Sequence, residues 1–237
     1  MDLGEIIKDS LSYPLSNIKS LAIFAILGTI VGVVVGSSLV GVVVSINGGR
    51  VVETLASGFI GFIIALVVGF IISGFQLDII KFGIERRNDG PSLDLLRQFI
   101  NGVKLMVVSL IYYIIPLIIV AVLGLFLRSW IMSIITLILF IIFGLAQFMA
   151  QCRLAKTEDL ADALAIGEAI GDISRVGILR LLLFIIMVFV IAFVLILISA
   201  LIMNWNSAVG GIILGIVGVY LIFFVGRATG LLYSDVY

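Results

Sequence analysis

The stretch KFGIERRNDGPSLDLLRQFINGVK, residues 81–104, decides the fold that this sequence predicts. It is the longest polar segment in a chain that is otherwise mostly apolar, and it separates two long apolar hairpins. Its five positive charges are Lys81, Arg86, Arg87, Arg97 and Lys104. Long apolar segments joined by basic connections are typical of a polytopic membrane protein, and the basic connections indicate its orientation.

The composition excludes a soluble globular domain. Of the 237 residues, 63% are hydrophobic and only 12% are charged. The mean hydropathy is +1.39, whereas a soluble domain is about half apolar and about a quarter charged. The formal net charge is zero, so we expect no nucleic-acid partner. The chain has no histidine and one cysteine, Cys152, so we expect no metal and no other cofactor.

Six apolar segments are long enough to cross a bilayer, which takes about 20 mostly apolar residues. They are Leu21–Ile46, Val51–Ile80, Leu105–Leu127, Trp130–Ala150, Leu181–Met203 and Ala208–Val225. None of them alternates in polarity as a barrel strand would, so each is predicted to be a helix. The sequence therefore predicts an all-α integral membrane protein in which six transmembrane helices form three hairpins.

The lysines and arginines predict the orientation. Of the fourteen in the chain, only Arg50 and Arg128 lie on one side of the predicted spans. The other twelve are Lys8, Lys19, Lys81, Arg86, Arg87, Arg97, Lys104, Arg153, Lys156, Arg175, Arg180 and Arg227. We therefore expect a cell-membrane protein with both termini in the cytoplasm.

Amphipathic segments precede the first, third and fifth spans. Leu3–Ile18, Leu93–Val103 and Leu160–Ile173 each place apolar residues at helical spacing. They predict three cytoplasmic interfacial helices that form a collar around the bundle. Basic residues near the start of the following spans, Lys19, Lys104, Arg175 and Arg180, are candidate contacts for lipid headgroups.

This rhythm suggests one membrane domain, residues 1–237, built as a pseudo-threefold repeat of units at about 1–83, 84–153 and 154–237. The alternative is that any series of helical hairpins with basic inner loops has the same rhythm.

Glycines at a spacing of four mark candidate helix contacts. Gly28, Gly32 and Gly36 lie in the first span, and Gly211 and Gly215 lie in the sixth. Such small-residue ridges let helix backbones approach closely. We expect them to serve packing within one chain, with dimerisation as the alternative. Pro116 lies within the third span and predicts a kink, which is either a fixed packing feature or a hinge.

Polar residues near the cytoplasmic ends of the second, fourth and sixth spans are the only candidates for chemistry. They are Gln76, Asp78, Gln147, Gln151 and Arg227. If these spans converge, the residues would form a polar collar in which Asp78 and Arg227 are partners. The alternative is that they extend toward the headgroups to stay hydrated. The sequence contains no nucleotide-binding, hydrolase or metalloprotease motif.

Three stretches together resemble a family of archaeal integral-membrane proteins known as domain of unknown function 4013. They are MDLGEIIKDSLSYPLSNIK (1–19), GPSLDLLRQFINGVKLMVVSLIYYIIPLI (90–118) and GRATGLLYSDVY (226–237). The resemblance implies a multi-pass membrane protein without an assigned activity. It transfers no catalytic residues.

We expect a non-enzymatic scaffold or accessory protein that acts through its interfacial helices, with membrane lipids and a cytoplasmic or membrane protein as partners. The alternative is a transporter or channel for a small solute or lipid. An integral lipid-modifying enzyme is the third hypothesis. A centre filled by side chains favours the scaffold, and a continuous polar cavity favours transport.

Overall fold

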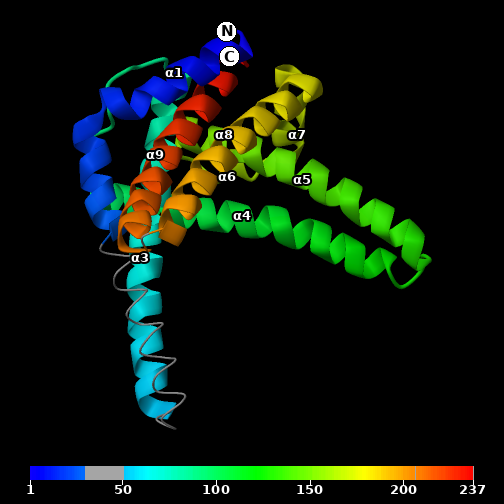
Figure 1. Cartoon of the computed structure of the whole chain (residues 1–237). Coiled ribbons are helices and arrows are strands. Elements are labelled where there is room, and N and C mark those ends of the chain that lie inside the picture. The colour runs from blue at the N-terminus through cyan, green and yellow to red at the C-terminus, as the bar shows by residue number, and fades with distance from the viewer. Residues whose placement is uncertain (30–50, 206, 237) are drawn as a thin grey trace.

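The computed structural model describes residues 1–29, 51–205 and 207–236, which form helices and no strand (Figure 1). The helices are α1 (Leu3–Ser16), Ile18–Thr29, α3 (Val51–Ile84), α4 (Leu95–Leu123), α5 (Ser129–Thr157), α6 (Leu160–Ala163), α7 (Ile166–Val176), α8 (Ile178–Trp205) and α9 (Ser207–Tyr233). The chain is therefore all-helical over the part described, as the sequence predicts.

Five helices in the described ranges are long and apolar enough to cross a membrane. The candidate spans are Gly58–Ile84, Leu95–Leu123, Trp130–Thr157, Ile178–Ile202 and Ile213–Tyr233. They correspond to the second to sixth predicted segments, and most extend further at the charged end. The first predicted segment, Leu21–Ile46, lies largely outside the described residues.

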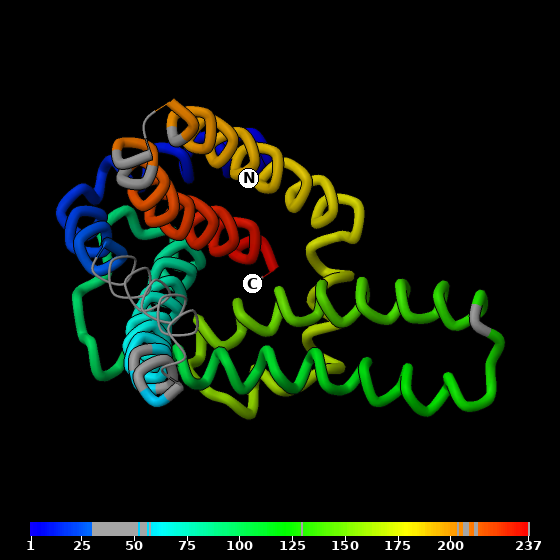
Figure 2. The backbone as a smooth tube through the Cα atoms, turned by 60° about the horizontal axis from the view of Figure 1, so that its bottom comes forward, coloured from blue at the N-terminus to red at the C-terminus, as the bar shows by residue number. Residues whose placement is uncertain are grey.

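The helices meet at one charged end and separate away from it. Near that end α3 packs against both α4 and α9, and α8 lies alongside α9. From there α3 runs in one direction and the α4–α5 hairpin in another (Figures 1 and 2). α4 and α5 have 29 residues each, which is about 43 Å of helix. This exceeds the roughly 30 Å hydrocarbon thickness and suits tilted helices.

Glycines allow the closest helix crossings. A Cβ atom on Gly102 of α4 would overlap the Phe70 carbonyl of α3, and one on Gly74 of α3 would overlap the Gln98 carbonyl of α4. α3 meets α9 in the same way. A Cβ on Gly83 would lie 2.9 Å from the Gly230 Cα. The backbones therefore touch at both crossings, which only glycine permits.

The predicted glycine ridges contribute less to these contacts. A Cβ on Gly28 would meet the Val219 side chain of α9 at 3.3 Å, whereas one on Gly215 would meet no described atom within 4 Å. Gly32 and Gly36 lie outside the described residues, as do the surroundings of Gly211. The sequence pattern singled out repeated glycines, but close approach depends on where the helix axes cross.

The first and third predicted interfacial segments contain helices that are separate from the spans, although the third, predicted as Leu160–Ile173, is divided into α6 and α7. α1 is bent by 77° from the helix Ile18–Thr29, and α7 is separated from α8 by Gly177, whose φ of +92° favours glycine. Both helices pack on the rest of the protein, with Ile6 and Ile173 among their buried side chains.

The second predicted interfacial helix, Leu93–Val103, is wrong. The Asp94 carboxylate caps the start of α4 by accepting from the Arg97 amide at 3.1 Å. From Leu95 the helix continues unbroken to Leu123. Its first turns bury Gln98 and Asn101 and pack on α3, so this segment is an extension of the span. A collar of three interfacial helices is not formed.

Candidate functional site

Charged and amide side chains are buried at the end where the helices meet. We call this set the polar layer; its most buried members are Asp78, Gln98, Asn101, Arg153, Asp172 and Arg227. Burial of an ionised group is costly unless a partner of opposite charge and hydrogen bonds compensate for lost water. The partners of each member therefore show how the layer is built.

Asp78 joins α3 to α4. Its side chain is only 4% exposed, and its carboxylate accepts from Arg97 Nη2 at 2.9 Å and from Gln98 Nε2 at 3.0 Å. The Gln98 amide nitrogen also donates to the Ser92 carbonyl at 3.1 Å. The glycine crossing brings these two helices close enough for such direct contacts.

Glu158 joins the end of α5 to α3 and α4. Its carboxylate accepts from Lys81 Nζ at 2.9 Å and from Arg97 Nη1 at 3.2 Å, and its carbonyl accepts from Lys104 Nζ at 2.7 Å. The hydrogen bond from Lys81 is the main cause that lowers the Glu158 pKa below its ordinary value. Glu158 also has a left-handed backbone, with φ of +55°, which terminates α5. Three cations thus hold one strained helix end.

Asp172 joins α7 to α5 and α9. This fully buried carboxylate accepts from Arg153 Nη1 at 3.1 Å, from Arg175 Nη1 at 2.9 Å and from the Tyr233 hydroxyl at 2.7 Å. Arg153 also donates to Asp162 Oδ1 at 2.5 Å. Asp172 is therefore satisfied by groups from three helices.

Arg227 joins α9 to α1 and to the α3–α4 connection. Its guanidinium is within 2.7 Å of Asp9 Oδ1 and of Asn88 Oδ1, and it also donates to the Arg87 carbonyl. It lies over the Tyr13 ring, 4.9 Å from the centroid, a favourable position for a cation.

Asp235 gathers a further set of cations at the same end. Its carboxylate accepts from the Met1 ammonium at 3.1 Å, from Arg86 at 2.8 Å and from Arg180 at 2.7 Å. Burial acts to raise the pKa of Asp235, but the hydrogen bonds from Arg180 and Met1 outweigh it and lower the pKa. Both chain ends are thereby tied to α8.

The polar layer is surrounded by exposed apolar side chains. In the first turns of α4, Gln98 and Asn101 are buried while Leu96 and Ile100 are 72% and 47% exposed. At the start of α8, Leu179 is 71% exposed next to Arg180. An arrangement that is polar inside and apolar outside is the reverse of that in a soluble protein. It fits an environment of lipid at the level of the layer.

The residues of the predicted polar collar have separate neighbours. Asp78 has Arg97 as its partner and Arg227 has Asp9, so the predicted pairing of Asp78 with Arg227 is wrong. Gln147 donates to Ser109 Oγ at 2.9 Å between α5 and α4. Gln76 lies beside Gly226, and Gln151 lines a groove between α5 and α8.

Three of the four predicted headgroup contacts bond within the protein. Lys104 donates to the Glu158 carbonyl, Arg175 to Asp172 and Arg180 to Asp235. Lys19 is exposed and lines a small recess at the bend after α1.

Sequence reasoning did not find the roles of Asp9, Asp172 and Glu158. Asp172 had a detectable signal, because Ala169, Ile173 and Val176 share its face of α7. A carboxylate on the apolar face of an amphipathic helix indicates a buried partner. Glu158 had no such signal, because its cations come from two other helices.

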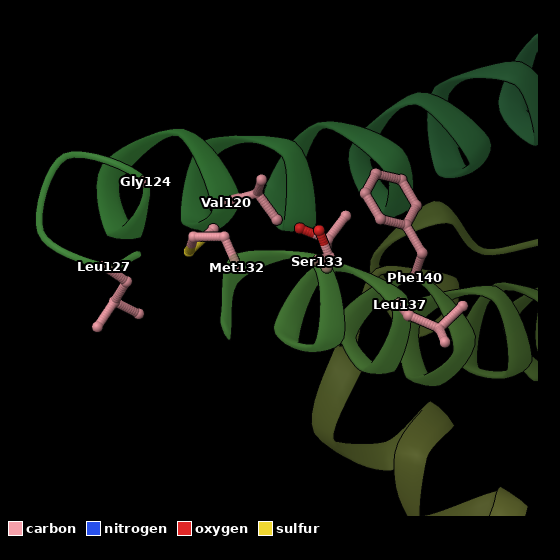
Figure 3. A pocket seen from close by; sticks show the side chains of 8 residues that line it. Val120, Gly124, Leu127, Met132, Ser133, Leu137 and Phe140 are labelled. Carbon is pink, nitrogen blue, oxygen red and sulfur yellow. The ribbon is translucent and has the colours of Figure 1, made fainter. Parts of the chain in front are cut away.

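Two larger hollows lie along the spans. One, about 760 Å³ and wide open, lies between α4 and α5 near their connecting turn (Figure 3). The other, about 580 Å³, is the groove between α5 and α8, which Val225 of α9 also lines. Both are lined mainly by apolar side chains. Within the described ranges, no group of three or more Cys, Asp or Glu is placed to hold a metal ion.

Residues 57–204 match the model of a family described as proteins of unknown function, DUF4013. The chain belongs to this family. The match spans α3 to most of α8, so it contains Asp78, Glu158 and Asp172 but neither α1 nor α9. DUF4013 thus covers the α3–α4 crossing and the α5–α7 contact of the polar layer. No curated protein and no solved structure matches the chain.

Proposed function

We propose that this protein is a non-enzymatic membrane scaffold whose polar layer holds three splayed hairpins in fixed directions. The first hairpin would comprise residues 21–46 and α3, giving six spans in total. Its partners would be membrane lipids and another protein, and that protein would bind at the charged end of the molecule. The charged end and both termini would face the cytoplasm, since twelve of the fourteen lysines and arginines lie on that side of the spans.

The observation that supports this proposal is the internal pairing of the polar layer. Asp78, Asp172 and Arg227 each bond to side chains from other helices. Their charges are therefore used to join the elements from α1 to α9. A transport path would instead need polar groups that are free to exchange partners with a moving solute. The predicted collar of three interfacial helices does not support the proposal, because its second helix, Leu93–Val103, is part of the start of α4.

Cross-linking in membranes, paired with a flux assay, tests the proposal. Lys8 and Lys19 are exposed, and we expect an amine-reactive reagent to link both to the same partner protein. Lys8→Glu and Lys19→Glu should weaken that link while the melting temperature stays unchanged. In liposomes, the purified protein should release encapsulated potassium or small dyes no faster than protein-free vesicles. A protein-dependent, saturable flux would instead establish the transporter hypothesis.

Thiol labelling tests the orientation. Cys152 is fully buried, so it must be replaced by alanine and reporters introduced elsewhere. Ser174 is exposed on α7, and Leu125, at the α4–α5 turn, is 80% exposed. An impermeant reagent should label Leu125→Cys in intact cells and Ser174→Cys only in inverted vesicles. The opposite pattern would reverse the topology and place the charged end outside.

A further inference from the structure

The groove between α5 and α8 has the form of a site for a single lipid chain. Its walls are the α5 residues around Gly144 and the α8 residues around Val188, and Val225 of α9 also lines it. Phe148 and Phe184 approach across it with ring centroids 6.1 Å apart. At about 580 Å³, it lies within the range of roughly 300–1,000 Å³ that is usual for small-molecule sites.

The polarity of the groove changes along its length. Its lining runs from Phe140 to Gln151 along α5 and from Ala192 to Leu182 along α8, about 16 Å on each helix, and the two helices diverge away from the charged end (Figures 1 and 2). Phe140 and Phe189 lie at the end away from the polar layer, and Gln151 lies at the end near it. Gln147 also lines the groove, but its amide nitrogen already donates to Ser109. This gradient matches a lipid, whose hydrocarbon lies deep and whose linkage oxygens lie near the interface.

Size distinguishes a lipid chain from a protein helix. A helix about 10 Å wide and 16 Å long occupies roughly 1,250 Å³, about twice the volume of the groove. A helix from a second copy or another protein could therefore rest on the rim but not fill the groove. An extended hydrocarbon chain is narrow enough to enter it.

The nearby cations determine which part of the lipid is recognised. Arg153, two residues beyond Gln151, is bound to Asp162 and Asp172, and Arg180, two residues before Leu182, is bound to Asp235. Their charges are compensated within the protein. The neutral Gln151 amide is therefore the polar group that a bound lipid would meet first.

We propose that the α5–α8 groove binds one chain of a membrane lipid, with the Gln151 amide donating a hydrogen bond to the oxygen that links the chain to the glycerol. The site selects hydrocarbon and a linkage oxygen and is indifferent to headgroup charge. It goes beyond the proposed scaffold, because the lipid completes the contact between the second and third hairpins.

Photo-cross-linking tests this site. The purified protein is placed in vesicles that contain phosphatidylglycerol or phosphatidylethanolamine with a diazirine in one acyl chain, and the labelled peptides are identified by mass spectrometry. We expect adducts on residues 140–151 and 182–192 to exceed those on the exposed residues of α4 between 110 and 122 severalfold, equally for both lipids. Equal labelling of α4 and the groove would overturn the site, and labelling by phosphatidylglycerol alone would overturn recognition through the linkage.

Glycine variants provide a matched control. A Cβ on Gly144 or on Gly215 meets no described atom within 4 Å, so both positions have open space for a side chain to begin, but only Gly144 lines the groove. Gly144→Leu should reduce groove labelling at least threefold, whereas Gly215→Leu should leave it unchanged, with equal melting temperatures. If Gly144→Leu fails to fold, Ala192→Leu fills the groove from the other wall.

A polar variant tests the hydrogen bond. Gln151→Leu should reduce groove labelling roughly two- to tenfold, as expected for one net hydrogen bond. Unchanged labelling in both Gly144→Leu and Gln151→Leu would overturn the proposal, as would cross-links from groove residues to a second protein chain. None of these outcomes depends on the cross-links of Lys8 and Lys19, so the lipid site and the scaffold fail independently.

Discussion

The charged end of the molecule and the far ends of its hairpins use opposite means of stabilisation. At the charged end, Gly102 and Gly230 bring backbones into contact, and fully buried Asp172 is surrounded by ion-pair partners. Toward the far ends, α3 and the α4–α5 hairpin separate (Figures 1 and 2), and Phe59 and Leu125 are 66% and 80% exposed. A buried charge requires a defined partner, whereas an apolar side chain in lipid does not.

The difference teaches that the direction of each hairpin is determined at one end only. α3 crosses α4 at Gly74 and Gly102 and crosses α9 at Gly83 and Gly230. Beyond these crossings α4 and α5 continue side by side as a helical hairpin (Figure 2). Changes at the charged end should therefore have large effects on stability, and changes along the exposed faces should have small ones.

The largest effect is expected from Asp172→Ala. The substitution leaves the Arg153 guanidinium, whose side chain is 8% exposed, without its buried partner, which typically costs about 3–5 kcal/mol. Thermal unfolding in detergent measures the loss. Glu168→Ala is the control, because Glu168 is 59% exposed and 3.9 Å from the same arginine, and its effect should stay within about 0.5 kcal/mol. Equal losses would mean that Asp172 is not a structural centre.

The second effect comes from the α3–α4 crossing. Gly102→Ala introduces a methyl group that overlaps the Phe70 carbonyl, so the helices must move apart at a cost of about 1–3 kcal/mol or more. Gly144→Ala is the matched control, since its methyl group meets no described atom within 4 Å. There the better helix propensity of alanine should stabilise by up to about 1 kcal/mol. The melting temperatures should therefore change in opposite directions, and a shared direction would contradict the close crossing.

An acid-dependent effect is expected at Glu158. Its pKa is lowered in the folded protein from the ordinary value of 4.5. The pairing therefore stabilises the fold fully above the unfolded pKa and is lost as the pH falls through the folded pKa. The wild-type melting temperature should drop below about pH 4.5, and Glu158→Gln should start lower at neutral pH and show a smaller drop. If the melting temperature of both proteins fell equally with pH, other carboxylates would be the cause of the acid sensitivity.

The smallest effect is expected on the exposed face of α9. Gly215→Leu should change the free energy of unfolding by no more than about 0.5 kcal/mol, because a side chain there meets no described atom within 4 Å. The same variant examines the dimerisation alternative for the glycine ridges. A change in mass by light scattering would show that this face seats a second copy.

The spans were predictable because each carries its own signal. A run such as LLLFIIMVFVIAFVLILISALIM, residues 181–203, is apolar throughout, and the bilayer requires it to be a helix. Periodicity also marked the segments that contain α1 and α7, but it did not predict the break between α6 and α7. The prediction that Leu93–Val103 forms a helix separate from the third span was wrong, because these residues begin α4. An amphipathic pattern does not indicate whether the chain bends at its end or continues as the same helix.

The partners within the polar layer could not be predicted. Asp78 lies 19 residues from Arg97, and Arg227 lies 218 residues from Asp9. Among fourteen basic and fourteen acidic residues, many pairings satisfy charge equally well. Position in the sequence marked Asp78 and Arg227 as polar candidates near the span ends, but it did not predict their burial and it paired them with each other.

The sequence by itself determined that this protein is helical, that its solvent is lipid and that its charges gather at one end. These properties depend on local composition and on the free energy of transfer between water and hydrocarbon, which each segment carries independently. Only the tertiary structure decided which glycines permit contact, which cations neutralise Asp172 and Glu158, and where the α5–α8 groove opens. Those features depend on how helix axes cross, and crossing angles are set by the fit of many side chains from segments far apart in the chain.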